Sequence, residues 1–507
     1  MSTSLSPLQK PPLWERTGVI LAALALWLLL TAAWRPLLLP DEGRYASVAW
    51  EMWRADAVVP TLNGLPFFHK PPLLYWLDMA AFSLLGVNAF AARIGPALGA
   101  FVLGASLYVH LRHWHGERVA RVGLVLLATT PFFFVGGQYV NHDMGVAGCI
   151  TAAVLAAVRG LESVGPQRRA WLIQAWLFCG LGVLAKGLIG IVLPGLVVVP
   201  WLLAQKRWKD LLGLLHPFGV LVFIAVVLPW MVAMQSRFPG FFDYFIVEQH
   251  FKRYQGTVFN NQQPVWFYLA VVPLLTLPWS LWLWPALRRA RRLRLGGQDR
   301  KWALYAWWVV AIVGFFSMPR SKLVGYVLPA LAPWCALLAL ALADRMVAWK
   351  RTAVVSAVVC VAVVGGIAWK VPYSAHETAQ VLREQWRPGD RVVFVDEYLY
   401  DLPFYAQLRE PVWVLSRWND ADIAQRDNWR KELHDALRFA TPQSRAYLVP
   451  FEEAARVTCT SGQVWWVGRQ DPRQQFPSLA QSPSLQALQP VHQARQVQLW
   501  RSAGQPC

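Results

Sequence analysis

Acidic and basic side chains gather in a few short polar segments that interrupt long apolar runs. The first segment, PDEGRYASVAWEM, places Asp41 and Glu42 side by side directly after an apolar stretch, with Arg44 close behind. A carboxylate at a helix start stays ionised because it lies at the positive end of the helix dipole, and it can accept a proton from a substrate. We take Asp41 as a candidate catalytic group and Glu42 and Arg44 as its supports. A purely capping role for Asp41 stays open on these residues alone.

The residues after Asp41 also predict how this segment is held. Apolar side chains recur at Tyr45, Val48, Ala49 and Met52, the spacing of one helix face. An amphipathic helix of this kind is expected to lie in the plane of the membrane interface.

The second polar segment, FFHKPPLLYW, places His69 and Lys70 immediately before two prolines. Proline fixes φ and lacks an N–H, so the pair is predicted to lie on a rigid extended stretch rather than inside a helix. A lysine there supplies a point charge for a phosphate, or it extends to lipid headgroups. The sequence leaves both interpretations open.

The segment FFDYFIVEQHFKRY contributes Glu248, His250 and Arg253. Two imidazoles and a carboxylate suit a divalent metal, so His69, His250 and Glu248 are candidate ligands, with zinc as the natural expectation.

A later segment, MPRSKLVGYVLPALAP, adds Arg320, Lys322 and, one helical turn further on, Tyr326. Cations without acidic neighbours in sequence indicate an anionic ligand. We therefore predict that Lys70, Arg253, Arg320 and Lys322 recognise a diphosphate-like group or a lipid phosphate.

Membrane-spanning helices are the elements that must position these segments. The 507 residues are 56% hydrophobic and 15% charged and include 29 Trp, which is more apolar surface than one soluble core can hide. Stretches long enough to cross a bilayer recur about eleven times. They lie at 17–34, 93–111, 119–138, 144–158, 171–186, 188–204, 211–234, 264–287, 302–317, 323–343 and 352–369.

The distribution of charge predicts the orientation of these helices. The net charge of +19 belongs to residues 1–370, because residues 371–507 contain 15 basic and 15 acidic residues. The basic residues cluster in short loops at 112–121, 168–169, 206–209, 288–301 and 345–351, as the positive-inside rule describes. We expect a membrane protein with a cytoplasmic N-terminus and no nucleic-acid partner. Loops 35–70, 139–144, 235–263 and 317–322 then face the periplasm or the cell exterior.

The chain changes character near residue 370. Mixed segments such as DRVVFVDEY, EPVWVLS and RAYLVP predict short strands between polar, helix-compatible stretches. We expect a polytopic all-α membrane domain over residues 1–370 and a small soluble α/β domain over residues 371–507 on the periplasmic side. The six cysteines show no CxxC spacing and are interpreted as packing residues.

The sequence resembles a known family, the polyprenyl-phosphate-dependent glycosyltransferases of the C-type membrane fold. The resemblance is closest to the bacterial aminoarabinose-type lipid A glycosyltransferases and extends to the protein O-mannosyltransferases. The segments PDEGRYASVAWEM, HKPPLLYWL, ARIGPAL, NHD and SKLVGYVLPALAP follow in the order of the family's landmarks. The resemblance implies the C-type fold for the membrane domain. It also implies a location in the bacterial inner membrane, with loops 35–70, 139–144, 235–263 and 317–322 as the catalytic periplasmic loops.

The resemblance also implies roles for single residues. Asp41 matches the catalytic carboxylate, Asp143 a second functional acid, and Lys70 the lysine that meets the carrier phosphate. Tyr326 matches a tyrosine of the donor site, and His250 matches a metal-ligand histidine. The residue before the lysine, commonly Glu in the aminoarabinose enzymes, is His69 here, a departure that bears on the metal.

The implied reaction is an inverting transfer of aminoarabinose or another sugar from undecaprenyl phosphate to a periplasmic acceptor, with a lipid A phosphate as the first expectation. An O-glycosyltransferase that modifies proteins or glycans with the same donor class is an alternative. A transporter or flippase for the lipid carrier is another, but it should bury charges at mid-span, where only Lys186 and Asp78 come close. A structural assembly factor would leave Asp41, Lys70 and His250 unexplained.

Overall fold

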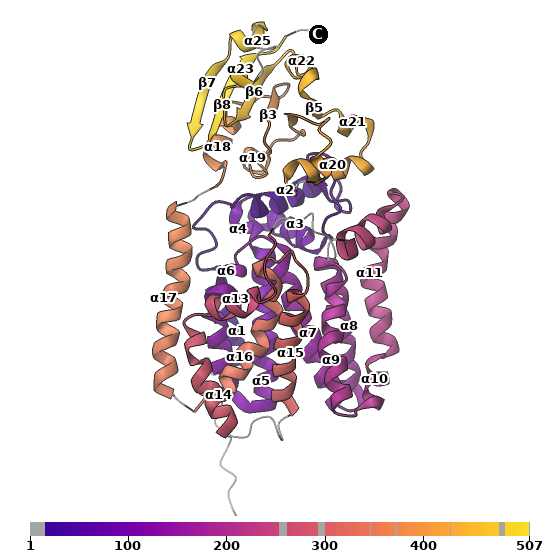
Figure 1. The fold of residues 1–507 in the computed structure, drawn as a ribbon, viewed down its shortest axis with the longest axis vertical. Coiled ribbons are helices and arrows are strands. Elements are labelled where there is room, and N and C mark those ends of the chain that lie inside the picture. Colours follow the sequence, from indigo (N-terminus) through magenta and orange to yellow (C-terminus); the bar gives the residue numbers. More distant parts are fainter. Residues whose placement is uncertain are drawn as a thin grey trace, which may run out of the picture.

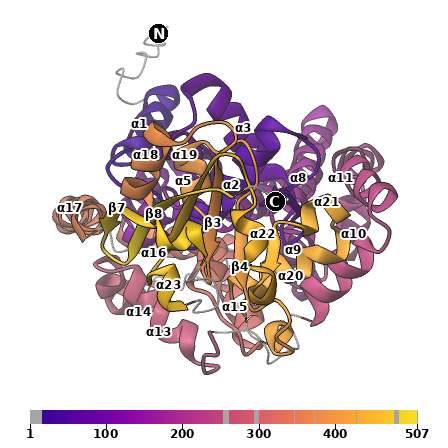
Figure 2. The same cartoon turned by 90° about the horizontal axis from the view of Figure 1, so that it is seen from above.

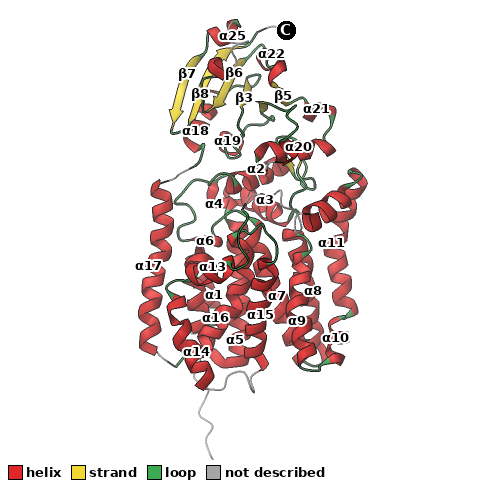
Figure 3. Ribbon diagram, viewed as in Figure 1, coloured by secondary structure: helices red, strands yellow, loops and turns green. Residues whose placement is uncertain are grey.

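The computed structural model describes residues 16–252, 261–292, 300–344, 346–370, 373–425, 427–475 and 482–505. A bundle of long helices forms one part, and an α/β unit lies over one end of it (Figures 1 and 3). Seen from above, this unit covers the middle of the bundle, while α17 stands at its edge (Figure 2).

Apolar helices make up the bundle. α7 is buried along nearly its whole length and occupies the centre, whereas α17 turns exposed valines outward, including Val354 and Val358. The helices are α1 (Thr17–Leu29), α5 (Ile94–Ala128), α7 (His142–Glu162), α8 (Gly165–Lys186), α9 (Ile189–Ala204), α11 (Pro217–Arg237), α13 (Phe267–Leu275), α14 (Leu283–Arg292), α15 (Arg300–Ser317), α16 (Leu331–Leu342) and α17 (Met346–Lys370).

Within the described ranges, five helices are long and apolar enough to cross a membrane, or six if the bent pair at α13 and α14 forms one span. Shorter apolar helices lie at Thr17–Leu29, Leu73–Leu85 and Ile189–Ala204. The expectation of about eleven spans therefore stays a prediction.

The segment α5 contains a reversal at Gly116, whose φ of 84° lies in the region that favours glycine. A Cβ atom added to Gly104 would lie 3.5 Å from the Leu124 side chain. Residues twenty positions apart in one straight helix would be separated by about 30 Å. The two halves of α5 therefore pack side by side, in keeping with the two apolar stretches at 93–111 and 119–138.

A layer of short elements separates the bundle from the α/β unit. It contains α2 (Asp41–Arg54), α3 (Leu73–Leu85), α4 (Ala89–Ala92) and the antiparallel strands β1 (Thr61–Leu62) and β2 (Leu65–Pro66). Asn63 and Gly64 join the strands with positive φ angles of 55° and 70°, which these residue types tolerate. Glu51 of α2 accepts both backbone N–H groups of this turn, at 2.6 and 3.0 Å.

The α/β unit is built on a six-stranded sheet of order β5-β4-β3-β6-β8-β7. Strands β5 (Leu448–Pro450), β4 (Trp413–Ser416), β3 (Arg391–Val395) and β6 (Gln463–Gly468) pair in parallel. The antiparallel strands β8 (Val497–Ala503) and β7 (Gln489–Ala494) complete it. Helices α18 (His376–Gln385), α19 (Leu402–Ala406) and α20 (Trp429–Ala436) lie between the sheet and the bundle (Figure 1).

The apolar face of α2 packs against this unit rather than only against the membrane surface. Tyr45, Val48 and Met52 are buried in one cluster with Leu402 and Phe404 of α19. Hydrophobic burial thus joins the two parts of the chain into one core at the level of α2.

The cysteines divide into two kinds. Cys149, Cys179, Cys335 and Cys360 are free and buried, as packing residues would be. Cys459 is instead disulfide-bonded, so the interpretation as a packing residue is wrong for it.

Candidate active site

A small cavity of ≈ 90 Å³ lies where α2, the segment before α3, α7 and the end of α8 meet the α/β unit. Side chains from far-separated segments line it, and most of them are charged or polar. They are Asp41, Arg44, Tyr45, Phe67, His69, Lys70, Asn141, His142, Asp143, Lys186, Leu323, Tyr326 and Glu432. Six of the predicted site residues, Asp41, Arg44, His69, Lys70, Asp143 and Tyr326, are thereby brought together.

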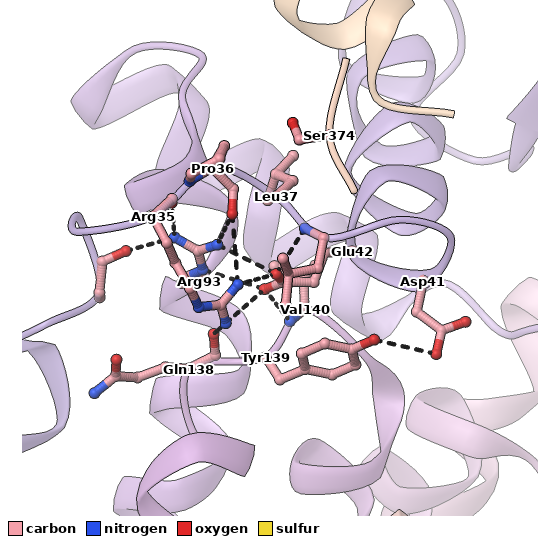
Figure 4. Close-up of polar contacts among 12 residues, drawn as sticks. Arg35, Pro36, Leu37, Asp41, Glu42, Arg93, Gln138, Tyr139, Val140 and Ser374 are labelled. Carbon is pink, nitrogen blue, oxygen red and sulfur yellow. Dashed lines mark hydrogen bonds and ion pairs between the residues drawn. The ribbon is translucent and has the colours of Figure 1, made fainter. Parts of the chain in front are cut away.

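Glu42 anchors the start of α2 through a set of buried polar contacts (Figure 4). Its wholly buried carboxylate pairs with Arg35 and Arg93 and accepts the backbone N–H groups of Leu38 and Val140, at 3.0 and 3.1 Å. Burial raises the pKa of Glu42, but the charges of Arg93 and Arg35 and their hydrogen bonds outweigh it and hold the pKa below its ordinary value. Glu42 is thus an ionised structural anchor.

Asp41, the first residue of α2, points the other way, toward the cavity. Its side chain is 39% exposed and pairs with Arg44 one turn further along the helix. The Tyr139 hydroxyl lies 3.4 Å from its other oxygen. Burial and the Asp41 charge raise the pKa of Tyr139, so this phenol stays protonated and acts as a donor. Asp41 is therefore oriented from two sides yet remains open to a ligand.

Asp143 is fixed at the start of α7. Asn141 caps that helix, accepting the Asp143 N–H at 3.0 Å, and its amide also donates to the carboxylate at 3.2 Å. Lys186, at the end of α8, forms an ion pair with Asp143 and lies 4.4 Å from the centre of the Tyr326 ring. A Cβ atom on Gly325 would collide with the Asp143 carboxylate, so glycine makes room for this acid.

His69 and Lys70 enter the cavity from the stretch before α3, whose first residue is Leu73. Pro72 is the N-cap residue of α3, which confirms that the His69-Lys70 pair precedes the helix. The prediction of an extended stretch is wrong, because residues 68–70 form a turn and a bend. The His69 ring lies 4.6 Å from Phe67 and 6.0 Å from Tyr244. Lys70 thus adds a cation to the cavity that Asp41 and Asp143 also line.

Two predicted phosphate ligands lie away from this cavity. The ammonium group of Lys322 is buried and donates to the backbone carbonyls of Gln263 and Pro319, at 2.8 and 2.5 Å. Arg320 is exposed in the same loop and lines neither this cavity nor the larger cavity of ≈ 1200 Å³ that adjoins Asp41. Lys322 therefore folds its loop instead of reaching the site. Arg253 lies outside the described residues.

The predicted metal ligands do not assemble in the part of the chain that is described. Glu248, in the π-helix η2 (Asp243–Lys252), forms an ion pair with Arg438 of the α/β unit at 3.0 Å. The His250 side chain lies outside the described residues. No group of three His, Cys, Asp or Glu side chains suited to a metal occurs among the described residues. A divalent metal, with zinc first, stays a prediction.

A larger cavity of ≈ 1200 Å³ extends between the bundle and the α/β unit. Four residues line both cavities, namely Asp41, Arg44, Leu323 and Glu432. Asp41 therefore stands at the junction of a small, strongly charged cavity and a wide one.

Glu432, His142 and Lys186 line the small cavity but were not among the predicted site residues. Glu432 lies in the α/β unit and has no local signature, while His142 adjoins the predicted Asp143. Lys186 carried a signal, a lone charge ending an apolar run, which the sequence suggested only as a mid-span charge. In the structure it pairs with Asp143 at the cavity.

Comparison with known proteins places the chain. The model of the dolichyl-phosphate-mannose-protein mannosyltransferase family matches residues 69–232. The undecaprenyl phosphate-alpha-4-amino-4-deoxy-L-arabinose arabinosyl transferase of Enterobacter sp. (strain 638) is 32% identical over 382 residues, 72% of this chain and 68% of that relative. The chain belongs to the family of this arabinosyl transferase. The predicted resemblance is thereby confirmed.

Other members of the arabinosyl transferase family match shorter portions. The relative named undecaprenyl phosphate-alpha-4-amino-4-deoxy-L-arabinose arabinosyl transferase 2 from Pseudomonas fluorescens (strain Pf0-1) is 34% identical over 314 residues, 61% of this chain. The chain spans 56% of the length of that relative.

Two solved structures share the fold of this chain. ArnT from Cupriavidus metallidurans bound to undecaprenyl phosphate superposes with a TM-score of 0.80 at 24% identity, covering 96% of this chain and 97% of the other. The oligosaccharyltransferase AglB from Archaeoglobus fulgidus has a TM-score of 0.52 at 14% identity and covers 79% of this chain and 64% of the other. With the apolar helices, these matches establish a multi-pass membrane protein of the C-type fold.

Proposed function

We propose that this protein transfers a sugar from undecaprenyl phosphate to a periplasmic acceptor, with aminoarabinose as the sugar and a lipid A phosphate as the acceptor. The observation that carries the proposal is the convergence of Asp41, Lys70, Asp143 and Tyr326 on one cavity. The names of the curated relatives and the undecaprenyl phosphate bound by the Cupriavidus protein supply the donor class and the sugar.

The cavity's charges suit breakage of a glycosyl phosphate bond. When the bond between C1 of the sugar and the phosphate oxygen breaks, its electron pair stays on the departing phosphate. Lys70 supplies positive charge for that group, and Lys186 and Arg44 line the same cavity. We assign the small cavity to the donor phosphate and its sugar.

Asp41 has the position of the group that handles the acceptor, because it faces both cavities. If a hydroxyl attacks C1, Asp41 takes its proton as the new C–O bond forms. A phosphate acceptor attacks as an anion and has no proton to lose, so Asp41 then orients it or stabilises positive charge on the sugar ring. A single displacement of this kind inverts the configuration at C1.

We propose the inner membrane of a bacterium as the location, with the N-terminus cytoplasmic and residues 371–507 on the periplasmic side. Two observations support this orientation. The basic loop at residues 206–209 adjoins α10 (Trp208–Leu214), which lies at the end of the bundle remote from the sheet (Figure 1). The disulfide at Cys459 suits an oxidising compartment. The full set of about eleven spans belongs to this proposal.

Mass spectrometry of lipid A from cells with and without the gene tests the function directly. We expect the deletion strain to lose one glycosyl mass, and that mass identifies the sugar. The control is the deletion strain complemented with the wild-type gene and, separately, with the Asp41→Asn variant.

Unchanged lipid A in the deletion strain would refute the lipid A acceptor. The mannosyltransferase family match then favours protein or glycan O-glycosylation, the second candidate, and glycoprotein analysis of the same strains would detect it.

A further inference from the structure

Glu432 links the C-terminal unit to the cavity. Among the described residues that line the small cavity, it is the one contributed by residues 371–507. It lies in the first turn of α20, 388 positions from Arg44, with which it forms an ion pair. The Glu432 and Arg44 side chains are only 14% and 13% exposed.

Both oxygens of Glu432 are engaged in a directed chain of contacts. One oxygen pairs with Arg44, and the other accepts the Tyr400 hydroxyl at 2.6 Å. The second amino group of Arg44 pairs with Asp41. The Arg44 guanidinium also lies 5.0 Å from the Tyr45 ring centre and 5.5 Å from that of Tyr400, so two aromatic rings pack against it.

This arrangement limits how Arg44 can bind Asp41. A guanidinium free of other partners favours a two-pronged pair with a carboxylate, using two parallel N–H bonds. Here one amino group of Arg44 contacts Glu432 and the other contacts a single oxygen of Asp41, whose second oxygen is oriented toward Tyr139. Glu432 thereby fixes the direction from which Arg44 meets Asp41.

The helix that carries Glu432 is fixed without this contact. Asn428 caps α20 by accepting two backbone N–H groups, at 3.0 and 3.2 Å, and Lys431 pairs with Asp435 at 3.0 Å. The ion pairs of Arg438 with η2 also join the two parts of the chain, yet the Arg438 side chain is 42% exposed and lines neither cavity. The Glu432–Arg44 pair differs because it lies where the two cavities join.

We propose that Glu432, with Tyr400 behind it, is a positioning residue for the transfer reaction: through Arg44 it sets the direction of the Asp41 carboxylate at the junction of the two cavities. This assignment rests on the proposed function. It makes residues 371–507 a component of the active site.

Kinetics of the purified full-length protein with an undecaprenyl-phosphate-linked sugar test the assignment. In Glu432→Gln we expect kcat to fall roughly 10- to 100-fold, since a small misplacement of a reacting group has an effect of that size. The donor KM should stay within about twofold, because Lys70, the residue assigned to the donor phosphate, is unchanged. Tyr400→Phe should also lower kcat, but by a smaller factor than Glu432→Gln does.

Two controls separate positioning from folding. Tyr405→Phe removes a matched hydroxyl at the same interface, which accepts the Leu37 N–H at 2.7 Å but lines neither cavity, and it should retain wild-type kcat. In an Arg44→Gln background, adding Glu432→Gln should lower kcat by a further factor of less than about two. The reason is that the effect of Glu432 passes through Arg44.

The outcomes are distinct. Absence of transfer by the wild-type protein would refute the proposed function and this assignment with it. Wild-type transfer together with unchanged kcat in Tyr400→Phe and in a folded Glu432→Gln overturns the assignment alone. Additive losses in the Arg44→Gln background also overturn it, because they show an effect that does not pass through Arg44.

Discussion

The carboxylate of Glu42 and the guanidinium of Arg93 lie 3.2 Å apart, and neither side chain has any surface in contact with solvent. Arg93 also donates to the backbone carbonyls of Arg35 and Pro36, at 2.8 and 2.9 Å (Figure 4). A third hydrogen bond joins it to the carbonyl of Ala32, at 2.6 Å. This buried pair ties the end of the first apolar segment to α2. It thereby fixes the residue next to Asp41.

Glu42→Gln should lower the stability of the folded protein. Removing one partner of a buried ion pair leaves the other charge uncompensated, which lowers the free energy of unfolding by about 3 to 5 kcal/mol. Thermal unfolding in detergent measures the effect. Glu453→Gln, at an exposed ion pair with Arg456, is the control and should change it by about 0 to 1 kcal/mol. Equal melting temperatures for the two variants would contradict the role of Glu42.

Asp41→Asn should distinguish the two classes of acceptor. The amide can still accept from Arg44 but cannot take a proton, so a hydroxyl acceptor should react about 10² to 10⁴ times more slowly. A phosphate acceptor needs no base, and the loss should be far smaller at high pH. Rates with each acceptor over a range of pH provide the measurement. Equal losses with both acceptors would count against this division of roles.

Lys70→Met and Lys322→Met should have different consequences. Lys70 lines the cavity, so its replacement should lower kcat/KM for the donor by roughly 10²-fold, as loss of one donor to a developing oxyanion does. Lys322 holds two backbone carbonyls, so its replacement should lower the free energy of unfolding by about 1 to 3 kcal/mol. Donor kinetics and thermal unfolding of both variants test this contrast. A stronger kinetic loss in Lys322→Met would reverse our placement of the phosphate.

Gly325→Ala should impair the reaction without unfolding the chain. The added methyl group would meet the Asp143 carboxylate, which Lys186 and Asn141 hold in place. Relief of this contact moves the acid by about an ångström, which should lower kcat by roughly 10²-fold. Gly314→Ala is the matched control, since a Cβ there meets no atom within 4 Å. If both glycine variants keep wild-type kcat, the position of Asp143 does not matter for turnover.

Stability should depend on pH through Asp401, which lies beside α2. Burial raises its pKa from 3.8 to about 6, although Ser374 and the Ala375 N–H donate to it at 2.7 and 2.9 Å. The pKa of Asp401 is higher in the folded than in the unfolded state. Its contribution to the free energy of unfolding is therefore fully present below about pH 4 and is lost as pH rises through about 6.

Melting temperatures of the wild type and Asp401→Asn from about pH 4 to pH 7 test this sign. The wild type should lose stability relative to the variant as pH rises, since the amide does not ionise. A constant difference between the two proteins would show that Asp401 does not titrate in this range.

Local sequence determined the helical membrane architecture and the candidate motifs. Apolar runs and basic loops are local features, and each of the predicted apolar stretches contains helix in the described structure. The turn at Asn63-Gly64 is local in the same sense, because positive φ angles favour these two residue types. The order of the motifs matched the family, and Asp41, Lys70, Asp143 and Tyr326 do line one cavity.

Only the tertiary structure decided which charges meet. Glu432 reaches Arg44 across 388 positions, Arg93 reaches Glu42 across 51, and Lys322 turns to backbone carbonyls instead of the cavity. Ion pairs of this kind leave no periodic signal, since a carboxylate near a guanidinium can be supplied by any segment that the fold brings close. Hydropathy fixes where helices form, but the packing of α2 between the bundle and the sheet selects the partners that orient Asp41.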